Sequence, residues 1–114
     1  MWLIVNVYDT ANNLASEIKK SEEYMNYKMA KEALNLNPSL KEKMKEFERI
    51  RYETQISAMQ TGKTDEEKYK KMQDIYAELI EIDEAKKFFE AETKFNILIA
   101  DVNRIIGEAI RDVM

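Results

Sequence analysis

The segment of this chain that most resembles a chemical motif is Gly62-Lys63-Thr64, which matches the end of a phosphate-binding loop. In such a loop, glycine amides surround the phosphates while the lysine and the threonine contact phosphate charge and magnesium. The full motif needs a second glycine at position 57, where this chain has Ser57. It also follows a buried strand, whereas a helical pattern comes before it here. We therefore interpret the segment as a plain turn between helices.

Pairs of carboxylates at helical spacing, such as Glu42 with Glu46 and Glu81 with Glu84, are the second candidate chemistry. Metal-binding helical bundles combine such glutamates with histidines, and this chain contains no histidine and no cysteine. Lysines surround the glutamates, so the pattern favours a solvated charged surface. Without thiolates there are also no ligands for an iron–sulfur cluster. We predict no catalytic residue, no cofactor, no metal site and no small-molecule substrate.

The composition points to one helical domain. The chain has 114 residues, 45% of them hydrophobic and 35% charged, with only 2 glycines and 1 proline. So few turn-forming residues do not suit a β-sandwich or a βαβ fold, while Glu, Lys, Ala, Met and Leu favour helix. We predict a single all-α domain over residues 1–114, an antiparallel bundle of about four to five helices with a long C-terminal helix.

The net charge and the N-terminal residues indicate which partners and which compartment to expect for the protein. The net charge is −4, from 18 basic and 22 acidic residues, which disfavours a dedicated nucleic-acid surface. The apolar start Met1-Trp2-Leu3-Ile4-Val5 is shorter than a signal-peptide core or a membrane span of about 20 residues. We interpret it as the beginning of the first helix. The sequence thus predicts a cytoplasmic protein with no membrane segment.

Capping residues predict where the helices begin. An oxygen-bearing side chain just before a helix accepts a hydrogen bond from one of its first free amides, and proline suits the first helical position. The predicted caps are Ser21, Asn37 before Pro38, Thr64 in a capping box with Glu67, and Asp83. These positions divide the chain into helices joined by short connections.

The longest pattern lies in the last third of the chain. Nine positions follow one unbroken three–four spacing, and eight of them are apolar: Ala85, Phe88, Glu92, Phe95, Ile99, Val102, Ile106, Ala109 and Val113. A stripe that repeats every 3.5 residues is typical of a helix that packs along another helix. The first helix shows the same register at Ile4, Val7, Ala11, Leu14 and Ile18, so the two can pack together.

The length of this stripe predicts assembly. A helix from about Glu84 to Val113 would reach roughly 45 Å, against about 33 Å for the third helix. An exposed apolar strip of that length on a soluble protein usually marks an interface. We predict a homodimer or a higher homo-oligomer with these interface residues: Ile4, Val7, Phe95, Ile99, Val102, Ile106 and Ala109. In a monomer the stripe would instead fold back onto the first helix.

Two residues of the last helix depart from its pattern. Glu92 occupies a stripe position, where it either reaches solvent or a lysine at the rim or fixes the alignment of a partner helix. Gly107 costs about 1 kcal/mol relative to alanine inside a helix. With Ala100 and Asn103 it forms a strip of small residues beside the stripe. Close approach of another helix would explain the strip, and so would tolerance near a fraying end.

One order of features runs through nearly the whole chain: Leu14-Ala15-Ser16-Glu17-Ile18, Ser21-Glu22-Glu23-Tyr24 with Tyr27, Phe47, Gly62, and Phe89-Glu90-Ala91-Glu92 leading to Ile99, Val102 and Ile106. In this order the chain resembles the YlbF/YheA/YmcA family of small helical bacterial proteins, and it looks closer to the YheA-like branch, whose role is undefined. The resemblance implies protein partners in a cytoplasmic complex that influences RNA processing, competence, sporulation and biofilm formation. Some members of that complex carry cysteines for an iron–sulfur cluster, and this chain has none.

We therefore predict a non-enzymatic helical interaction protein that serves as a regulatory adaptor in a bacterial cytoplasm. A second interpretation is a nucleic-acid-associated factor that uses basic residues of the third helix: Lys41, Lys43, Lys45 and Arg49. A third is an enzyme with a lysine or a glutamate as acid or base, which would need a buried carboxylate in a pocket.

Overall fold

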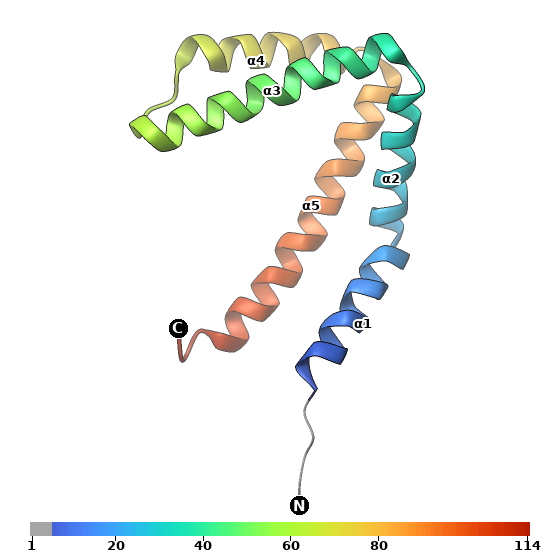
Figure 1. The fold of residues 1–114 in the computed structure, drawn as a ribbon, viewed down its shortest axis with the longest axis vertical. Coiled ribbons are helices and arrows are strands. Elements are labelled where there is room, and N and C mark those ends of the chain that lie inside the picture. Colours follow the sequence, from blue (N-terminus) through green and yellow to red (C-terminus); the bar gives the residue numbers. More distant parts are fainter. Residues whose placement is uncertain (1–5) are drawn as a thin grey trace, which may run out of the picture. The chain divides into compact units, whose positions relative to one another are not determined.

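The computed structural model describes residues 6–114 (Figure 1). Five α-helices make up this part of the chain: α1 Val7–Lys20, α2 Glu22–Asn35, α3 Pro38–Thr61, α4 Glu66–Leu79 and α5 Asp83–Ile110. The described residues contain no strand, so the all-α prediction and the long C-terminal helix are confirmed. The predicted helical role of residues 1–5, including Ile4, lies outside the described residues.

Side-chain caps start the first two helices. The Asn6 side chain accepts a hydrogen bond from the Asp9 amide at 3.0 Å and opens α1. The Ser21 hydroxyl donates to the Ile18 carbonyl at 2.6 Å and accepts from the Tyr24 amide at 3.1 Å. Ser21 therefore ends α1 and begins α2, which confirms it as a cap.

The caps of α3 also follow from local sequence. The Asn37 side chain accepts from the Leu40 amide at 3.2 Å, and Pro38 is the first residue of the helix, as predicted. The helix ends at Gly62, which has a left-handed backbone with φ of 72° and donates its amide to the Ala58 carbonyl at 2.8 Å. Glycine adopts this conformation without a steric penalty. Gly62 thus acts as a helix terminus, in agreement with the turn interpretation.

Two predicted caps are wrong. Asp65, and not Thr64, caps α4, because its carboxylate accepts from the Lys68 amide at 3.2 Å. Both residue types suit this position, and the choice between neighbours depends on which backbone turns into the helix. Asp83 is the first residue of α5 and not the cap before it. It pairs with Lys87 at 3.5 Å and places negative charge in the first turn, where the helix dipole favours it.

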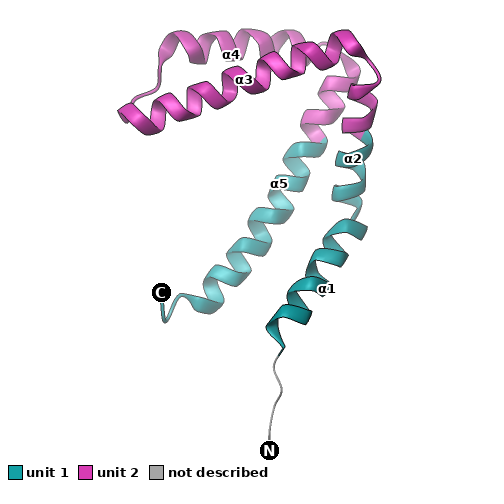
Figure 2. Cartoon of the chain, in the orientation of Figure 1, with its two compact units in different colours: residues 1–29, 91–114 teal, residues 30–90 magenta. Residues whose placement is uncertain are grey.

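The chain divides into two compact units, which Figure 2 colours separately: unit 1 comprises residues 1–29 and 91–114, and unit 2 comprises residues 30–90. The prediction of one domain over residues 1–114 stays a prediction. In unit 2, α3 and α4 lie side by side and run antiparallel (Figure 1). Its core consists of Leu34, Leu40, Met44, Phe47, Ile50, Thr54, Leu79, Ala85, Phe88 and Phe89, all buried.

An aromatic cluster holds the helices of unit 2 together. The Phe89 ring of α5 lies 5.4 Å from the Phe47 ring of α3 and 4.9 Å from the Tyr76 ring of α4, measured between centroids. Such tilted and edge-to-face contacts add to the free energy gained from apolar burial. Three helices therefore meet at one set of rings, and each covers the apolar side of the others.

In unit 1, the arm formed by residues 6–29 lies beside the later part of α5 (Figure 2). The rings of Tyr24 and Tyr27 pack against Phe95, with centroid distances of 5.9 and 5.4 Å. By contrast, α1 has no buried residue, and its Leu14 and Ile18 are only half-buried. The described part of unit 1 therefore has a much thinner core than unit 2.

Candidate functional site

The candidate site is the C-terminal half of α5, where apolar side chains face solvent. Among residues 92–114, all of which the structure describes, none is buried. Ile105, Ile106 and Ile110 are 61%, 48% and 41% exposed. Where several large aliphatic side chains are exposed together at one end of a helix, that end is more often an interaction surface than an ordinary solvent-exposed surface.

The predicted interface residues differ in their solvent exposure. Ile4 is outside the described residues, Val7 is 66% exposed at the start of α1, and Ile106 and Ala109 are exposed. Phe95, Ile99 and Val102 are half-buried. We call the stripe of three–four spacing from Ala85 to Val113 the α5 stripe. Because Phe95 already packs on two tyrosines of its own chain, the α5 stripe has an inner part that its own chain covers and an outer end that is open. Their role in an interface stays a prediction.

Charges on this half of α5 are confined to one side of the helix. Between Phe95 and Ile110 the charged residues are Asp101, Arg104 and Glu108. Arg104 pairs with Asp101 at 3.8 Å and with Glu108 at 3.5 Å. At 100° per residue, the three fall within about 60° of the helix circumference. The rest carries no charge, which makes the uncharged face wider than the stripe of an ordinary surface helix.

Glu92, the charged member of the α5 stripe, has a role within its own chain. It is half-buried, and the Tyr27 hydroxyl donates a hydrogen bond to its carboxylate at 3.4 Å. The same tyrosine ring stacks on Phe95. The polar and aromatic contacts together set the position of α2 along α5 in unit 1.

The strip of Ala100, Asn103 and Gly107 is exposed. A Cβ atom added at Gly107 would meet no atom within 4 Å. No helix of the described chain therefore approaches closely there, and packing within unit 1 does not account for the glycine.

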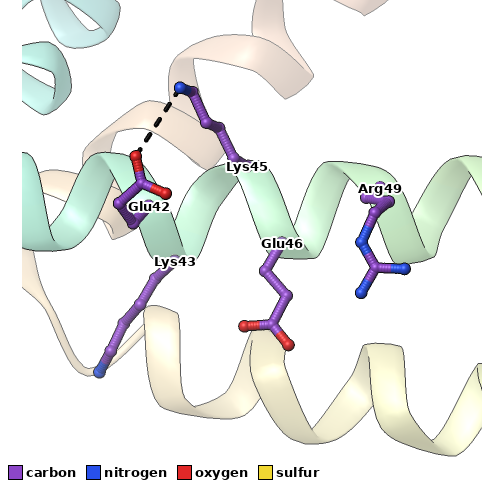
Figure 3. A pocket seen from close by; sticks show the side chains of 5 residues that line it. All are labelled: Glu42, Lys43, Lys45, Glu46 and Arg49. Carbon is purple, nitrogen blue, oxygen red and sulfur yellow. Dashed lines mark ion pairs between the residues drawn. The ribbon is translucent and has the colours of Figure 1, made fainter.

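The surface of α3 that would serve nucleic-acid binding has mixed charge (Figure 3). A shallow depression there is lined by Glu42, Lys43, Lys45, Glu46 and Arg49. Lys45 pairs with Glu42 at 3.7 Å, and Arg49 pairs with Glu53 at 2.9 Å. Carboxylates of the same helix thus neutralise two of the four predicted basic residues. This arrangement disfavours phosphate binding, which depends on unpaired positive charge.

Across residues 6–114, no three or more carboxylates gather closely enough to hold a metal ion. In the same part of the chain, every buried side-chain nitrogen and oxygen has a hydrogen-bond partner. None of the described helices is long and apolar enough to span a membrane.

Sequence reasoning missed two features of the site. It did not anticipate that Tyr24 and Tyr27 cover Phe95, because the partners lie far apart in the chain. It also left out Ile105 and Ile110, which flank the stripe and are exposed. The sequence did carry a signal for these two isoleucines, because only three residues between Phe95 and Ile110 are charged.

Known proteins share this sequence pattern and this fold. The family described as "Control of competence regulator ComK, YlbF/YmcA" matches residues 7–111. A UPF0342 protein of Desulfitobacterium hafniense is 31% identical over 96% of this chain and 89% of its own length. A UPF0342 protein of Clostridium novyi is 30% identical over 95% of both chains.

Two solved structures from Bacillus subtilis have the same fold. YheA superposes with a TM-score of 0.71 at 22% identity, covering 96% of this chain and all of its own. A chain from the structure of RicA in complex with RicF gives a TM-score of 0.60 at 24% identity, covering 91% of this chain and 92% of its own. From the matched residues 7–111 and the UPF0342 relatives, we conclude that this chain belongs to the YlbF/YmcA family.

Proposed function

We propose that this chain is a non-enzymatic interaction module that binds another helical protein chain through unit 1 and works as a regulatory adaptor in the cytoplasm. The observation that carries the proposal is the exposed apolar end of α5, with Ile105, Ile106 and Ile110 at 61%, 48% and 41% exposure. Water makes such a surface costly, at about 25 cal/mol per Å² of apolar area, and association with a partner removes that cost.

The nature of the partner follows from the surface. Its wide uncharged face suits another uncharged apolar helix, and a second copy of this chain presents one. We therefore propose a homodimer as the basic assembly. The structural neighbour from the RicA–RicF complex was solved with a protein partner, which supports protein–protein association in this fold. A regulatory complex would add further protein chains to the dimer.

Sedimentation equilibrium of two matched aspartate variants tests the interface. Ile106 lies on the open apolar face, whereas Ile97, at 55% exposure, lies about 180° around the same helix among the paired charges. We expect the unmodified chain and Ile97→Asp to sediment as dimers, with twice the 13.5 kDa monomer mass. Ile106→Asp should sediment as a monomer, because burying an unpaired carboxylate is costly.

Circular dichroism of both variants checks that the helices remain. Equal effects of the two substitutions would contradict the proposed face, and a monomeric unmodified chain at high micromolar concentration would contradict the homodimer.

The adaptor role has its own test in cells. Tagged forms of the unmodified chain, Ile106→Asp and Ile97→Asp are purified from the native cytoplasm, and co-purifying proteins are quantified. We expect one set of protein partners to be retained by Ile97→Asp and lost from Ile106→Asp. A partner set that is the same for all three forms would show that α5 does not recruit it.

A further inference from the structure

Three neighbouring apolar side chains are uncovered at the C-terminal end of α5. They are Ile106, Ala109 and Ile110, and all three are exposed. At 100° per residue they lie within about 100° of the helix circumference. We call these three residues the α5 end face. Exposed apolar area is costly in water, so an apolar segment that reaches the α5 end face gains free energy by covering it.

The beginning of α1 lies at the same end of unit 1 as the α5 end face. Tyr24 of the arm contacts Phe95 of α5. Three residues further along the arm, Tyr27 contacts Glu92, which is three residues earlier in α5. The two elements are therefore antiparallel, and counting back at 1.5 Å per residue brings Asn6 about level with the C-terminal end of α5. Figure 2 shows the beginning of α1 and the end of α5 at the same end of unit 1.

Asn6 is also the residue at which the helical path begins. Its side chain caps α1 by accepting a hydrogen bond from the Asp9 amide at 3.0 Å. Its own backbone, with φ of −109° and ψ of 88°, is not helical. A segment joined to Asn6 therefore starts beside the α5 end face and outside the path of α1.

The segment joined to Asn6 is apolar throughout. Its sequence is Met1-Trp2-Leu3-Ile4-Val5, which is the longest uninterrupted run of apolar residues in the chain. We call residues 1–5 the apolar segment. Five extended residues reach about 17 Å. Ile106 lies only roughly 10 Å from the level of Asn6 along the helix axis, so the apolar segment is long enough to reach the whole α5 end face.

We propose that the apolar segment covers the α5 end face of its own chain and thereby competes with the partner chain for this surface. The competition rests on the proposed function and adds a regulatory contact to it. A segment that is tethered by a few residues has an effective concentration in the millimolar range. A second copy at micromolar concentration therefore meets a surface that is covered for part of the time.

The charges of α5 agree with an uncharged occupant. Asp101, Arg104 and Glu108 pair with one another, and they lie roughly 150° around the helix from the centre of the α5 end face. An apolar segment on this face therefore buries no unpaired charge. The indole of Trp2 supplies the largest single contribution, because a tryptophan side chain can bury about 150–250 Å².

The fluorescence of Trp2 tests the contact directly, because Trp2 is the only tryptophan of the chain. At a concentration where the chain is monomeric, we expect emission at shorter wavelength than that of free N-acetyltryptophanamide and weaker quenching by acrylamide. Ile106→Asp should shift the emission to longer wavelength, because a carboxylate on this face disfavours burial of the indole. Ile97→Asp, on the opposite side of α5, is the matched control and should leave the emission unchanged.

Sedimentation equilibrium tests the competition with the partner. Leu3→Ser combined with Ile4→Ser makes the apolar segment polar without shortening it. A surface that is covered half of the time in each of two copies weakens dimerisation about fourfold. We therefore expect the dissociation constant of the double variant to fall about fourfold or more.

The outcomes separate this inference from the proposed function. A monomer whose Trp2 emits like the free amide would overturn the contact and leave the proposed interaction module intact. Emission that moves to shorter wavelength only as dimers form, or a larger dissociation constant for the double variant, would overturn the competition and indicate that the segment contributes to the contact between copies.

A chain that stays monomeric at high micromolar concentration would contradict the homodimer and the competition. The emission of Trp2 in that monomer would still decide whether the apolar segment covers the α5 end face. Circular dichroism of each variant keeps loss of helix apart from loss of contact.

Discussion

Unit 2 and the described part of unit 1 are made of similar helices, but their apolar side chains differ in how far they are buried. Among residues 6–114, every buried apolar residue except Ala91 belongs to unit 2. In unit 1, α1 buries no residue, and α5 beyond Ala91 buries none. Unit 2 thus has a core of its own, whereas the described part of unit 1 leaves most of its apolar side chains exposed or half-buried.

The same difference in burial occurs within a single helix, along the α5 stripe. Its members Ala85 and Phe88, in unit 2, are 0% and 6% exposed, while Ile106, in unit 1, is 48% exposed. The spacing is the same at both ends. Periodicity determines which side of a helix is apolar, and the neighbours of the helix determine whether that side is buried.

The largest expected effect compares two phenylalanines of α5. Phe89 is 7% exposed and contacts the rings of Phe47 and Tyr76, so Phe89→Ala should lower the free energy of unfolding by about 3–5 kcal/mol. Phe95 is half-buried, and Phe95→Ala should cost about 1–2 kcal/mol under the same conditions. Urea denaturation followed by circular dichroism, at a concentration where the chain is monomeric, measures both. Equal costs would remove the distinction between the units.

The corrected cap of α4 gives an effect of intermediate size within unit 2. Asp65→Ala removes the acceptor for the Lys68 amide and should lower the free energy of unfolding by about 1 kcal/mol. Thr64→Ala, one residue earlier, should change it by less than about 0.5 kcal/mol. Thermal melts of the two variants side by side provide the measurement. The reverse ranking would restore Thr64 as the cap.

A smaller effect is expected from the polar contact of unit 1. Tyr27→Phe keeps the ring that stacks on Phe95 and removes the hydroxyl that donates to Glu92, so it should cost about 0.5–1 kcal/mol. Tyr24→Phe keeps a ring on the same phenylalanine and should cost less. Urea denaturation of the two variants decides this. A larger loss for Tyr24→Phe would show that Glu92 does not align α2 with α5.

The smallest effect is expected in the connection between α3 and α4. Lys63 is exposed next to the helix-ending Gly62, so Lys63→Ala should change the free energy of unfolding by less than about 0.5 kcal/mol. Calorimetric titration with ATP should give no binding heat for either form. ATP binding that vanishes with Lys63→Ala would identify a nucleotide site in this connection.

Local signals in the sequence were sufficient for much of the fold. Ser21, Asn37 with Pro38, and Gly62 mark helix ends because each acts on a backbone amide within three or four residues. The three–four spacing of apolar residues likewise predicted a long last helix. Where two neighbouring residues could both serve, as with Thr64 and Asp65, the local signal did not choose between them.

The sequence by itself determined the all-α class, most helix ends and the apolar side of α5, since these depend on neighbours within a turn or two of the chain. Only the tertiary structure decided that the stripe is covered at Phe88 and open at Ile106. It also decided that Tyr27 meets Glu92 across 65 positions of sequence. Such contacts depend on which helices come together in space, and a repeat along one helix carries no information about what lies opposite it.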